Sequence, residues 1–233
     1  MDDLKKQYLN DLRKSNVTDF DIKNSSRVLE TFNLALKTFY DTQIDNNARL
    51  IDLGYGNGSF LKVLEKSNIS STGYDYDKIN FESDKLPESS NSIDFVTCNS
   101  VIEHLSDVTN LFKEVHRILK PNGKFLLVTP NFYYDYKNFY DDPTHVNPFT
   151  VNKLDEVLKL FKFNKINIVP WVVKKNSLFW KIPFKFFVCR YFLITNKIDK
   201  IIFKEFKVKK YKLFLSISDE KDYSVAFTIL QTK

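Results

Sequence analysis

Glycine is concentrated at one point of this chain, between an apolar run and a stretch with helical periodicity. Only five of the 233 residues are glycine, and three of them lie within residues 54–58, Gly-Tyr-Gly-Asn-Gly. Glycine allows the backbone to turn with a positive φ, and it allows a ligand to reach the main chain without meeting a Cβ. A helix that begins behind such a turn directs N–H groups towards the ligand. The spacing therefore predicts a binding turn formed by Gly54, Gly56 and Gly58.

Two carboxylates flank this turn, and their positions indicate the kind of ligand. Asp52 precedes the first glycine by two residues, and Asp75 ends the next apolar run, where a carboxylate can hold two ribose hydroxyls. The third glycine comes one residue too early for the G-x-G-x-x-G pattern of dinucleotide sites. Asp52 would also repel a pyrophosphate. S-adenosylmethionine carries no phosphate, and its ammonium group is attracted to Asp52, so the pattern predicts S-adenosylmethionine as the cofactor.

Strand and helix patterns alternate around these residues. This alternation is typical of an α/β fold, a Rossmann-like, doubly wound and mostly parallel sheet. The predicted strands are 48–53, 72–75, 93–98, 124–129 and 165–172, and the predicted helices are 60–66, 108–119 and 152–161. Alternating apolar and polar residues over 223–231 predict an antiparallel edge strand at the C-terminus. Ligands of such sheets bind beyond the carboxyl ends of the strands, so the glycine turn, Asp75 and Asn99 are expected along one rim.

The chain is expected to form one domain with two appendages. Residues 1–47 are predicted to be an N-terminal helical cap, with residues 24–26, Asn-Ser-Ser, as the N-cap of its main helix. Residues 48–172 are the predicted cofactor-binding core. Residues 173–233 are predicted to add a basic aromatic helical insertion and the C-terminal edge strand to the same domain.

Composition excludes several classes of protein. Hydrophobic residues make up 43% of the chain and charged residues 27%, which is typical of globular proteins. Two cysteines cannot form a disulfide framework, and lysines interrupt every apolar run before it could span a membrane. The first residues lack the order of a signal peptide, so a cytoplasmic protein is expected, with peripheral membrane association left open. Three histidines and two distant cysteines predict no metal site.

Positive charge gathers in one region. Residues 160–212 carry 14 Lys and Arg against two acids, which indicates an anionic partner. Within this region, residues 178–212 interleave lysines with aromatic residues. Three interpretations stay open: a helix that covers the sheet with solvated lysines, a helix on an anionic membrane surface, or RNA binding. Nucleic acid is the least expected partner because no RNA-binding module pattern is present.

Five segments, in order, resemble the motifs of class I S-adenosylmethionine-dependent methyltransferases. They are similar to the small-molecule branch that includes quinone-biosynthesis and glycan-cluster methyltransferases. The segments are Leu50–Phe60, Leu86–Val96, Val101–Leu105, Ile118–Gly123 and Asp142–Thr150. The resemblance implies a small-molecule or lipid-linked acceptor, such as a glycan precursor or a quinone-like intermediate. No Asn-Pro-Pro-Tyr or Asp-Pro-Pro-Tyr follows Cys98, which argues against methylation of nucleobase amines.

The resemblance also assigns residues to the cofactor. Asp52 and the three glycines would line its methionine end, and Asp75 would take the ribose hydroxyls. Tyr76 would cover the adenine, and Asn99 would border the methionine moiety.

One departure from the family pattern follows the second strand. Members usually have a full helix there, but only residues 76–79 separate Asp75 from the next apolar and acidic run. Whether Glu82 or Asp84 takes the usual acidic position beside the adenine stays open.

Methyl transfer to oxygen is an in-line displacement, which mainly requires alignment of the reactants and exclusion of water. A hydroxyl acceptor must also lose its proton, and His145 is the candidate general base, with His104 as a weaker one. The sequence thus predicts a methyltransferase, with O-methylation as the expected reaction. The alternative is a protein that keeps the cofactor fold without turnover and binds a membrane surface or RNA.

Overall fold

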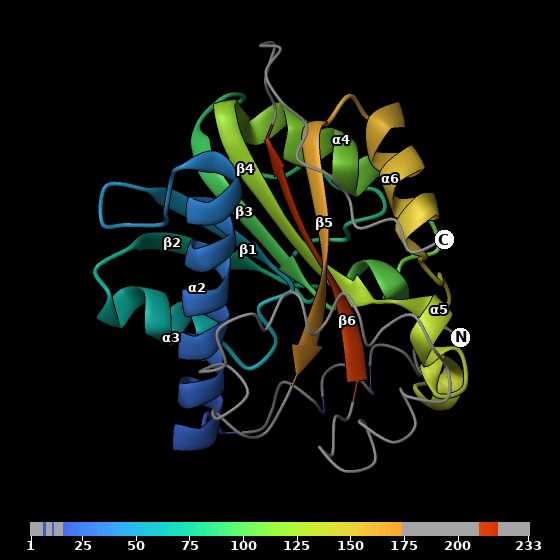
Figure 1. The fold of residues 1–233 in the computed structure, drawn as a ribbon. Coiled ribbons are helices and arrows are strands. Elements are labelled where there is room, and N and C mark those ends of the chain that lie inside the picture. Colours follow the sequence, from blue (N-terminus) through green and yellow to red (C-terminus); the bar gives the residue numbers. More distant parts are fainter. Residues whose placement is uncertain (1–6, 8–10, 12–15, 174–209, 219–233) are drawn as a thin grey trace.

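A six-stranded sheet organises the molecule in a computed structural model, which describes residues 7, 11, 16–173 and 210–218 (Figure 1). Its strand order is β2-β1-β3-β4-β6-β5. The strands are β1 (Arg49–Leu53), β2 (Ser70–Tyr74), β3 (Ile93–Asn99), β4 (Leu119–Pro130), β5 (Asn164–Val173) and β6 (Lys210–Ser218). The first four of these pair in parallel, and β6 pairs antiparallel with both β4 and β5. The predicted Rossmann-like, doubly wound and mostly parallel sheet is confirmed.

The antiparallel strand differs in its place from the sequence prediction. β6 lies between β4 and β5, so that β5 forms this edge of the sheet. Its residues, 210–218, precede the predicted edge strand 223–231, which lies outside the described residues. β6 begins with Lys210 and Lys212, and it lies within residues 173–233, where a basic helical insertion was predicted.

Helices cover both faces of the sheet, as Figure 1 shows. α2 (Asp19–Tyr40) and α3 (Ser59–Lys66) lie on one face, and α4 (Thr109–Ile118) and α6 (Val151–Leu160) on the other. Side chains of successive strand residues point to opposite faces, and both faces are buried. In β4, for example, Leu126 packs with α2 and α3, whereas Phe125 and Leu127 pack with α4 and α6. The apolar runs of the sequence therefore became central strands.

The N-terminal helix begins earlier than predicted. α2 starts at Asp19 with Thr18 as its N-cap, and Thr18 and Asp21 form a capping box in which each side chain accepts from the other's backbone N–H. Residues 24–26 lie inside the helix, so their predicted role as its N-cap was wrong. Ser25 is buried there, and its hydroxyl lies 2.9 Å from the hydroxyl of Ser59 at the start of α3. The N-terminal helix thus packs directly on the core.

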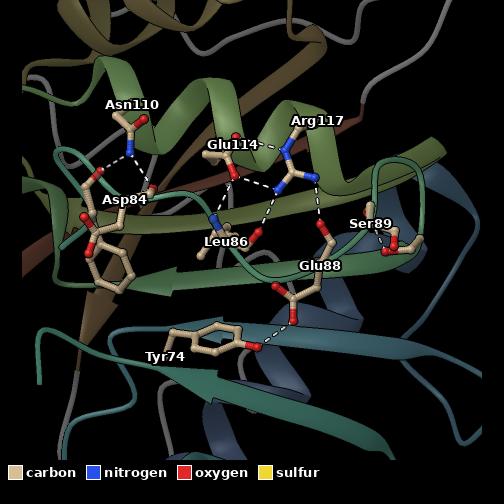
Figure 2. Close-up of polar contacts among 10 residues, drawn as sticks. Tyr74, Asp84, Leu86, Glu88, Ser89, Asn110, Glu114 and Arg117 are labelled. Atoms are coloured by element: carbon tan, nitrogen blue, oxygen red, sulfur yellow. Dashed lines mark hydrogen bonds and ion pairs between the residues drawn. The ribbon is translucent and has the colours of Figure 1, made fainter. Parts of the chain in front are cut away.

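The connection from β2 to β3, residues 75–92, contains no helix or strand. Side chains of α4 hold it in place instead (Figure 2). Arg117 donates to the carbonyls of Leu86 and Glu88 at 2.9 and 2.7 Å, and the Glu114 carboxylate accepts from the N–H of Leu86 at 2.8 Å. The Tyr74 hydroxyl donates to the Glu88 carboxylate at 2.7 Å. This network fixes the loop beside the end of β2, where the sequence places the cofactor.

Three short elements complete the described part of the chain. They are η1 (Ile102–His104), α5 (Phe132–Asp135) and η2 (Phe139–Asp141). α5 and η2 lie within the long irregular stretch between β4 and α6, and a bridge between Asn131 and Phe149 joins the two ends of that stretch. In the described residues, no helix combines the length and the apolar character needed to cross a membrane.

Candidate active site at the carboxyl ends of the parallel strands

The glycine turn leaves β1 with three residues in the left-handed region. Gly54, Gly56 and Gly58 have φ values of 83°, 57° and 79°. A Cβ on Gly54 would lie 2.2 Å from Cγ2 of Val101, so the first glycine allows η1 to approach the turn. Nothing lies within 4 Å of a Cβ added to Gly56 or Gly58. The second half of the turn therefore presents bare backbone to open space, as a ligand-binding turn requires.

Asp75 closes the turn from the end of β2. One of its carboxylate oxygens accepts from the N–H of Gly56 at 2.9 Å, and the other accepts from the N–H of Tyr76 at 2.6 Å. These contacts join the glycine turn to the strand that carries the ribose-binding candidate. The structure thus brings Asp75 and Tyr76 next to Gly56, as the fold prediction required.

Asp52 is the buried carboxylate of the site. Only 4% of it is exposed, and its Oδ1 accepts from the Thr97 hydroxyl of β3 at 2.7 Å. Burial raises the pKa of Asp52 to about 7, and the nearby negative charge of Asp75 adds to this increase, while the hydrogen bond from Thr97 opposes it. A cation bound beside Asp52 would stabilise its charged form. The geometry therefore suits the ammonium end of a ligand.

Two other candidates lie at or near this rim. Asn99 ends β3, and its Oδ1 accepts from the hydroxyl of Ser100 at 3.2 Å. Glu82 and Asp84 both bind backbone amides: Glu82 accepts from the N–H of Ser106 at 2.5 Å, and Asp84 from the N–H of Asn80 at 2.8 Å. Both acids thus contribute to loop structure, and the choice between them for the adenine-side position stays open.

The two candidate histidines come together although 41 positions separate them. His104 ends η1 and His145 lies in the loop before α6, and their ring centroids are 4.7 Å apart. The His104 Nδ1 lies 2.8 Å from the hydroxyl of Thr144, and the His145 Nδ1 lies 2.6 Å from the carbonyl of Phe139. Val101 contacts Gly54 and η1 follows Val101 directly, so the histidine pair and the glycine turn lie at the same end of the sheet.

Glu103 is a member of this group that the sequence analysis did not single out. It is 1% exposed, and the Thr129 hydroxyl of β4 donates to its carboxylate at 3.0 Å. One candidate ligand atom from each of Glu103, His104 and His145 can be chosen so that all three lie within 4.8 Å of one another. The expectation of no metal site rested on histidine and cysteine residues alone, and the fold brings the Glu103 carboxylate to the two histidines. Its position before His104, in a motif quoted for the family, was the available signal.

The loop that carries His145 exposes several aromatic side chains. Tyr133 is 67% exposed, and Tyr136 and Tyr140 are also exposed, whereas Phe139 is fully buried and its ring lies 4.6 Å from that of His145. The loop therefore exposes aromatic rings on the histidine side of the site.

Comparison with known proteins decides what this site belongs to. A family model described as "Methyltransferase domain" matches residues 23–168, more than half of the chain. The chain belongs to this methyltransferase family. It is 30% identical over 205 residues to the ubiquinone/menaquinone biosynthesis C-methyltransferase UbiE of Rickettsia felis, which covers 69% of this chain and 82% of that protein.

One further relative is also a methyltransferase, a solved structure shares the fold, and a short match is to a different enzyme. The ubiquinone biosynthesis O-methyltransferase of Xanthomonas oryzae is 27% identical over 134 residues, covering 48% of this chain and 56% of that protein. A crystal structure of a SAM-dependent methyltransferase from Archaeoglobus fulgidus superposes with a TM-score of 0.58 at 18% identity, covering 92% of this chain and 99% of that one. A short match, 60% identical over 42 residues, links 18% of this chain to 33% of a holo-[acyl-carrier-protein] synthase of Pelagibacter ubique. The chain thus spans very different shares of the relatives it matches.

The methyltransferase is of class I, and S-adenosylmethionine is its cofactor, as the sequence predicted. The residues present fit this group. Open space over Gly56 and Gly58 admits an approach to bare backbone, and the buried Asp52 offers a carboxylate whose raised pKa falls when a cation binds. Asp75 offers a carboxylate at the end of β2, where ribose hydroxyls bind in this type of fold.

Proposed function

We propose that this methyltransferase methylates a hydroxyl group of a small-molecule or lipid-linked acceptor. The observation that carries the proposal is that the cofactor turn and the histidine cluster share one edge of the sheet, joined by the contact between Val101 and Gly54. Two of the relatives named above are quinone-biosynthesis methyltransferases, one a C-methyltransferase and one an O-methyltransferase. A group that can take a hydroxyl proton beside the cofactor favours oxygen.

The proposed cofactor residues fall into three groups, one for each part of S-adenosylmethionine. Asp52, Gly54, Gly56 and Gly58 hold the methionine end, together with Asn99 at the end of β3. Asp75 takes the ribose hydroxyls, and Tyr76 covers the adenine. S-adenosylmethionine supplies the methyl group on a positively charged sulfur. The carboxylate of Asp52 and the bare backbone of the turn orient that end of the molecule.

The histidines serve the acceptor side of the reaction in this proposal. The carbonyl of Phe139 can only accept, so the contact at 2.6 Å places a proton on the Nδ1 of His145 and the lone pair on its Nε2. A neutral Nε2 can receive the proton of an acceptor hydroxyl, and His104 is the second candidate for this role. The aromatic loop, with Tyr133, Tyr136 and Tyr140, suits an apolar or ring-shaped acceptor.

The alternative is a protein that binds a membrane surface or RNA without turnover. Its basis, the basic aromatic stretch 178–212, lies outside the described residues except for residues 210–212. Cytoplasmic location and peripheral membrane association stay predictions. Cofactor binding by the full chain, with no affinity for anionic vesicles, would favour the enzyme.

Methyl transfer to hydroxylated rings tests the proposal. The full-length protein is incubated with methyl-labelled S-adenosylmethionine and 3,4-dihydroxybenzoate or catechol, with 3,4-dimethoxybenzoate as the matched acceptor without a free hydroxyl. We expect label on oxygen of the hydroxylated probes alone, located by mass spectrometry, and at least tenfold less in His145→Asn. Label on ring carbon would reject O-methylation. No label on any probe, while S-adenosylhomocysteine binds, would reject this acceptor class.

A further inference from the structure

Three side chains with metal-ligand chemistry converge beside the cofactor turn. A carboxylate oxygen of Glu103 and one nitrogen each of His104 and His145 lie within 4.8 Å of one another. Ligand atoms around a bound Zn²⁺ ion lie about 3.3 Å apart at the usual bond lengths of about 2.0–2.1 Å. Small side-chain rotations therefore bring the three atoms to bonding separations. Glu103 and most of His145 are buried, and His104 is half-buried.

Hydrogen bonds set both imidazoles in the form that metal ions bind. The Thr144 hydroxyl donates its single proton to Asp142 at 2.6 Å, so its contact with His104 at 2.8 Å requires a proton on the His104 Nδ1. The carbonyl of Phe139 requires the same of His145. In the neutral form, both rings therefore carry their lone pair on Nε2. An Nδ1–H held by a carbonyl or a carboxylate-linked group, with Nε2 towards the ion, is the usual arrangement of metal-bound histidine.

Backbone contacts hold the two ligand-bearing segments together. The carbonyl of Glu103 accepts from the N–H groups of Val146 and Asn147 at 2.9 and 3.0 Å. This ties η1 to the loop of His145. The Thr129 hydroxyl of β4 orients the Glu103 carboxylate from a third segment. The ligand set is therefore built into the fold of the metal-free chain, on elements that the sheet positions.

We propose that Glu103, His104 and His145 bind one divalent transition-metal ion of the Zn²⁺ type, leaving a coordination position for the acceptor oxygen. Two imidazoles and one carboxylate suit such ions, whereas Mg²⁺ and Ca²⁺ prefer oxygen ligands alone. The role of the ion rests on the proposed function. An acceptor hydroxyl that binds the ion would become more acidic and release its proton to solvent. Its oxygen keeps the electron pair that forms the bond to the methyl carbon, while the bond from that carbon to the sulfonium sulfur breaks and S-adenosylhomocysteine leaves. His145 then acts as a ligand of the ion, which takes over the task of a general base.

The test is titration of Co²⁺ into the chelator-treated, full-length protein, followed by calorimetry and by the visible absorption of bound Co²⁺. We expect one equivalent to bind, with affinity at least 100-fold weaker in Glu103→Gln and in His145→Asn. His116→Asn is the matched control, because His116 lies on α4 and packs against Phe163. We expect the affinity of this variant for Co²⁺ to be unchanged. Thr129→Val removes only the contact that orients Glu103, so affinity should fall about 10–100-fold.

The outcomes separate this inference from the proposed function. S-adenosylhomocysteine binding, measured on the same samples, shows which variants are folded and whether the cofactor site works. A wild-type protein that binds S-adenosylhomocysteine but not Co²⁺ would overturn the metal site and leave the methyltransferase proposal standing, with His145 as the base. Co²⁺ binding that Glu103→Gln, His145→Asn and His116→Asn weaken equally would also overturn it. A chelator that abolishes methyl transfer to catechol, with recovery on adding Zn²⁺ or Co²⁺, is expected.

Discussion

Asp52, the carboxylate proposed to face the ammonium group of the cofactor, is buried and has a raised pKa, so its replacement by asparagine is informative. Burial raises the pKa of Asp52 from 3.8 to about 7, so the folded protein keeps this proton at pH values at which the unfolded chain has lost it. The free energy of unfolding of the wild type therefore falls as the pH rises from about 4 to about 7. The whole difference is about 4 kcal/mol, and about 3 kcal/mol of it falls between pH 5 and pH 8.

Asp52→Asn removes this dependence. The asparagine is neutral at every pH, and its side-chain oxygen can still accept from Thr97. We expect urea denaturation to show that the variant gains about 3 kcal/mol relative to the wild type between pH 5 and pH 8. The same variant should bind S-adenosylmethionine at least tenfold more weakly at pH 8, because the ammonium group loses its counter-charge.

Asp107→Asn is the control for this titration. Asp107 is exposed, and a hydrogen bond from Thr109 lowers its pKa, so the residue stays charged throughout pH 5 to pH 8. Its replacement should change stability by the same amount at both pH values. If Asp52→Asn behaves in this way too, with no relative gain at pH 8, the assignment of Asp52 as a buried acid with a raised pKa is refuted.

Two further substitutions test how the site is held. Gly54→Ala should lower the free energy of unfolding by about 3 kcal/mol or more, because its Cβ would lie 2.2 Å from Cγ2 of Val101. Gly56→Ala should lower it by only about 1–2 kcal/mol, the cost of an alanine at a φ of 57°. Equal losses in urea denaturation would contradict the close approach of Val101 to Gly54. Arg117→Met should cost about 2–4 kcal/mol by the same measurement, and less at pH 3 than at pH 7, because Arg117 lowers the pKa of Glu114 and that stabilisation is lost as the pH falls below about 4.5. A loss that does not change with pH would contradict the ion pair.

The sequence was sufficient for the parallel half of the sheet. Strands β1, β3 and β4 contain apolar runs that are buried on both faces, and helices with clear apolar stripes follow β1 and β3. Phe125, Leu126 and Leu127 form such a run, and they alternate between the two cores. Local pattern and tertiary burial agree in this part of the chain, so reading the pattern gave the right elements.

The pattern was insufficient where local signals compete. Residues 24–26 contain good N-cap side chains, but the capping box of Thr18 and Asp21 satisfies the helix start about two turns earlier. β6 begins with Lys210 and Lys212, in a region that was predicted to be helical, and its pairing with β4 and β5 makes it a strand. Such pairing is a long-range property that a single sequence does not display.

The site shows the same division. The turn at Gly54, Gly56 and Gly58 was predictable, because glycine adopts a positive φ at little cost and is scarce elsewhere in the chain. The meeting of Glu103 and His145 does not, since it depends on the backbone contacts that join η1 to a distant loop. Spacing along the chain gives no measure of that distance.

Calorimetric titration of S-adenosylhomocysteine tests whether the cofactor binds at the end of β2. The titration compares the full-length wild type with Asp75→Ala and with Asp107→Ala as an exposed control. We expect the wild type and the control to bind equally, and Asp75→Ala to bind at least tenfold more weakly, the loss of about 1.4 kcal/mol or more expected for a charge-assisted contact to ribose. Equal binding by all three proteins, or none by the wild type, would contradict binding of the cofactor at the end of β2.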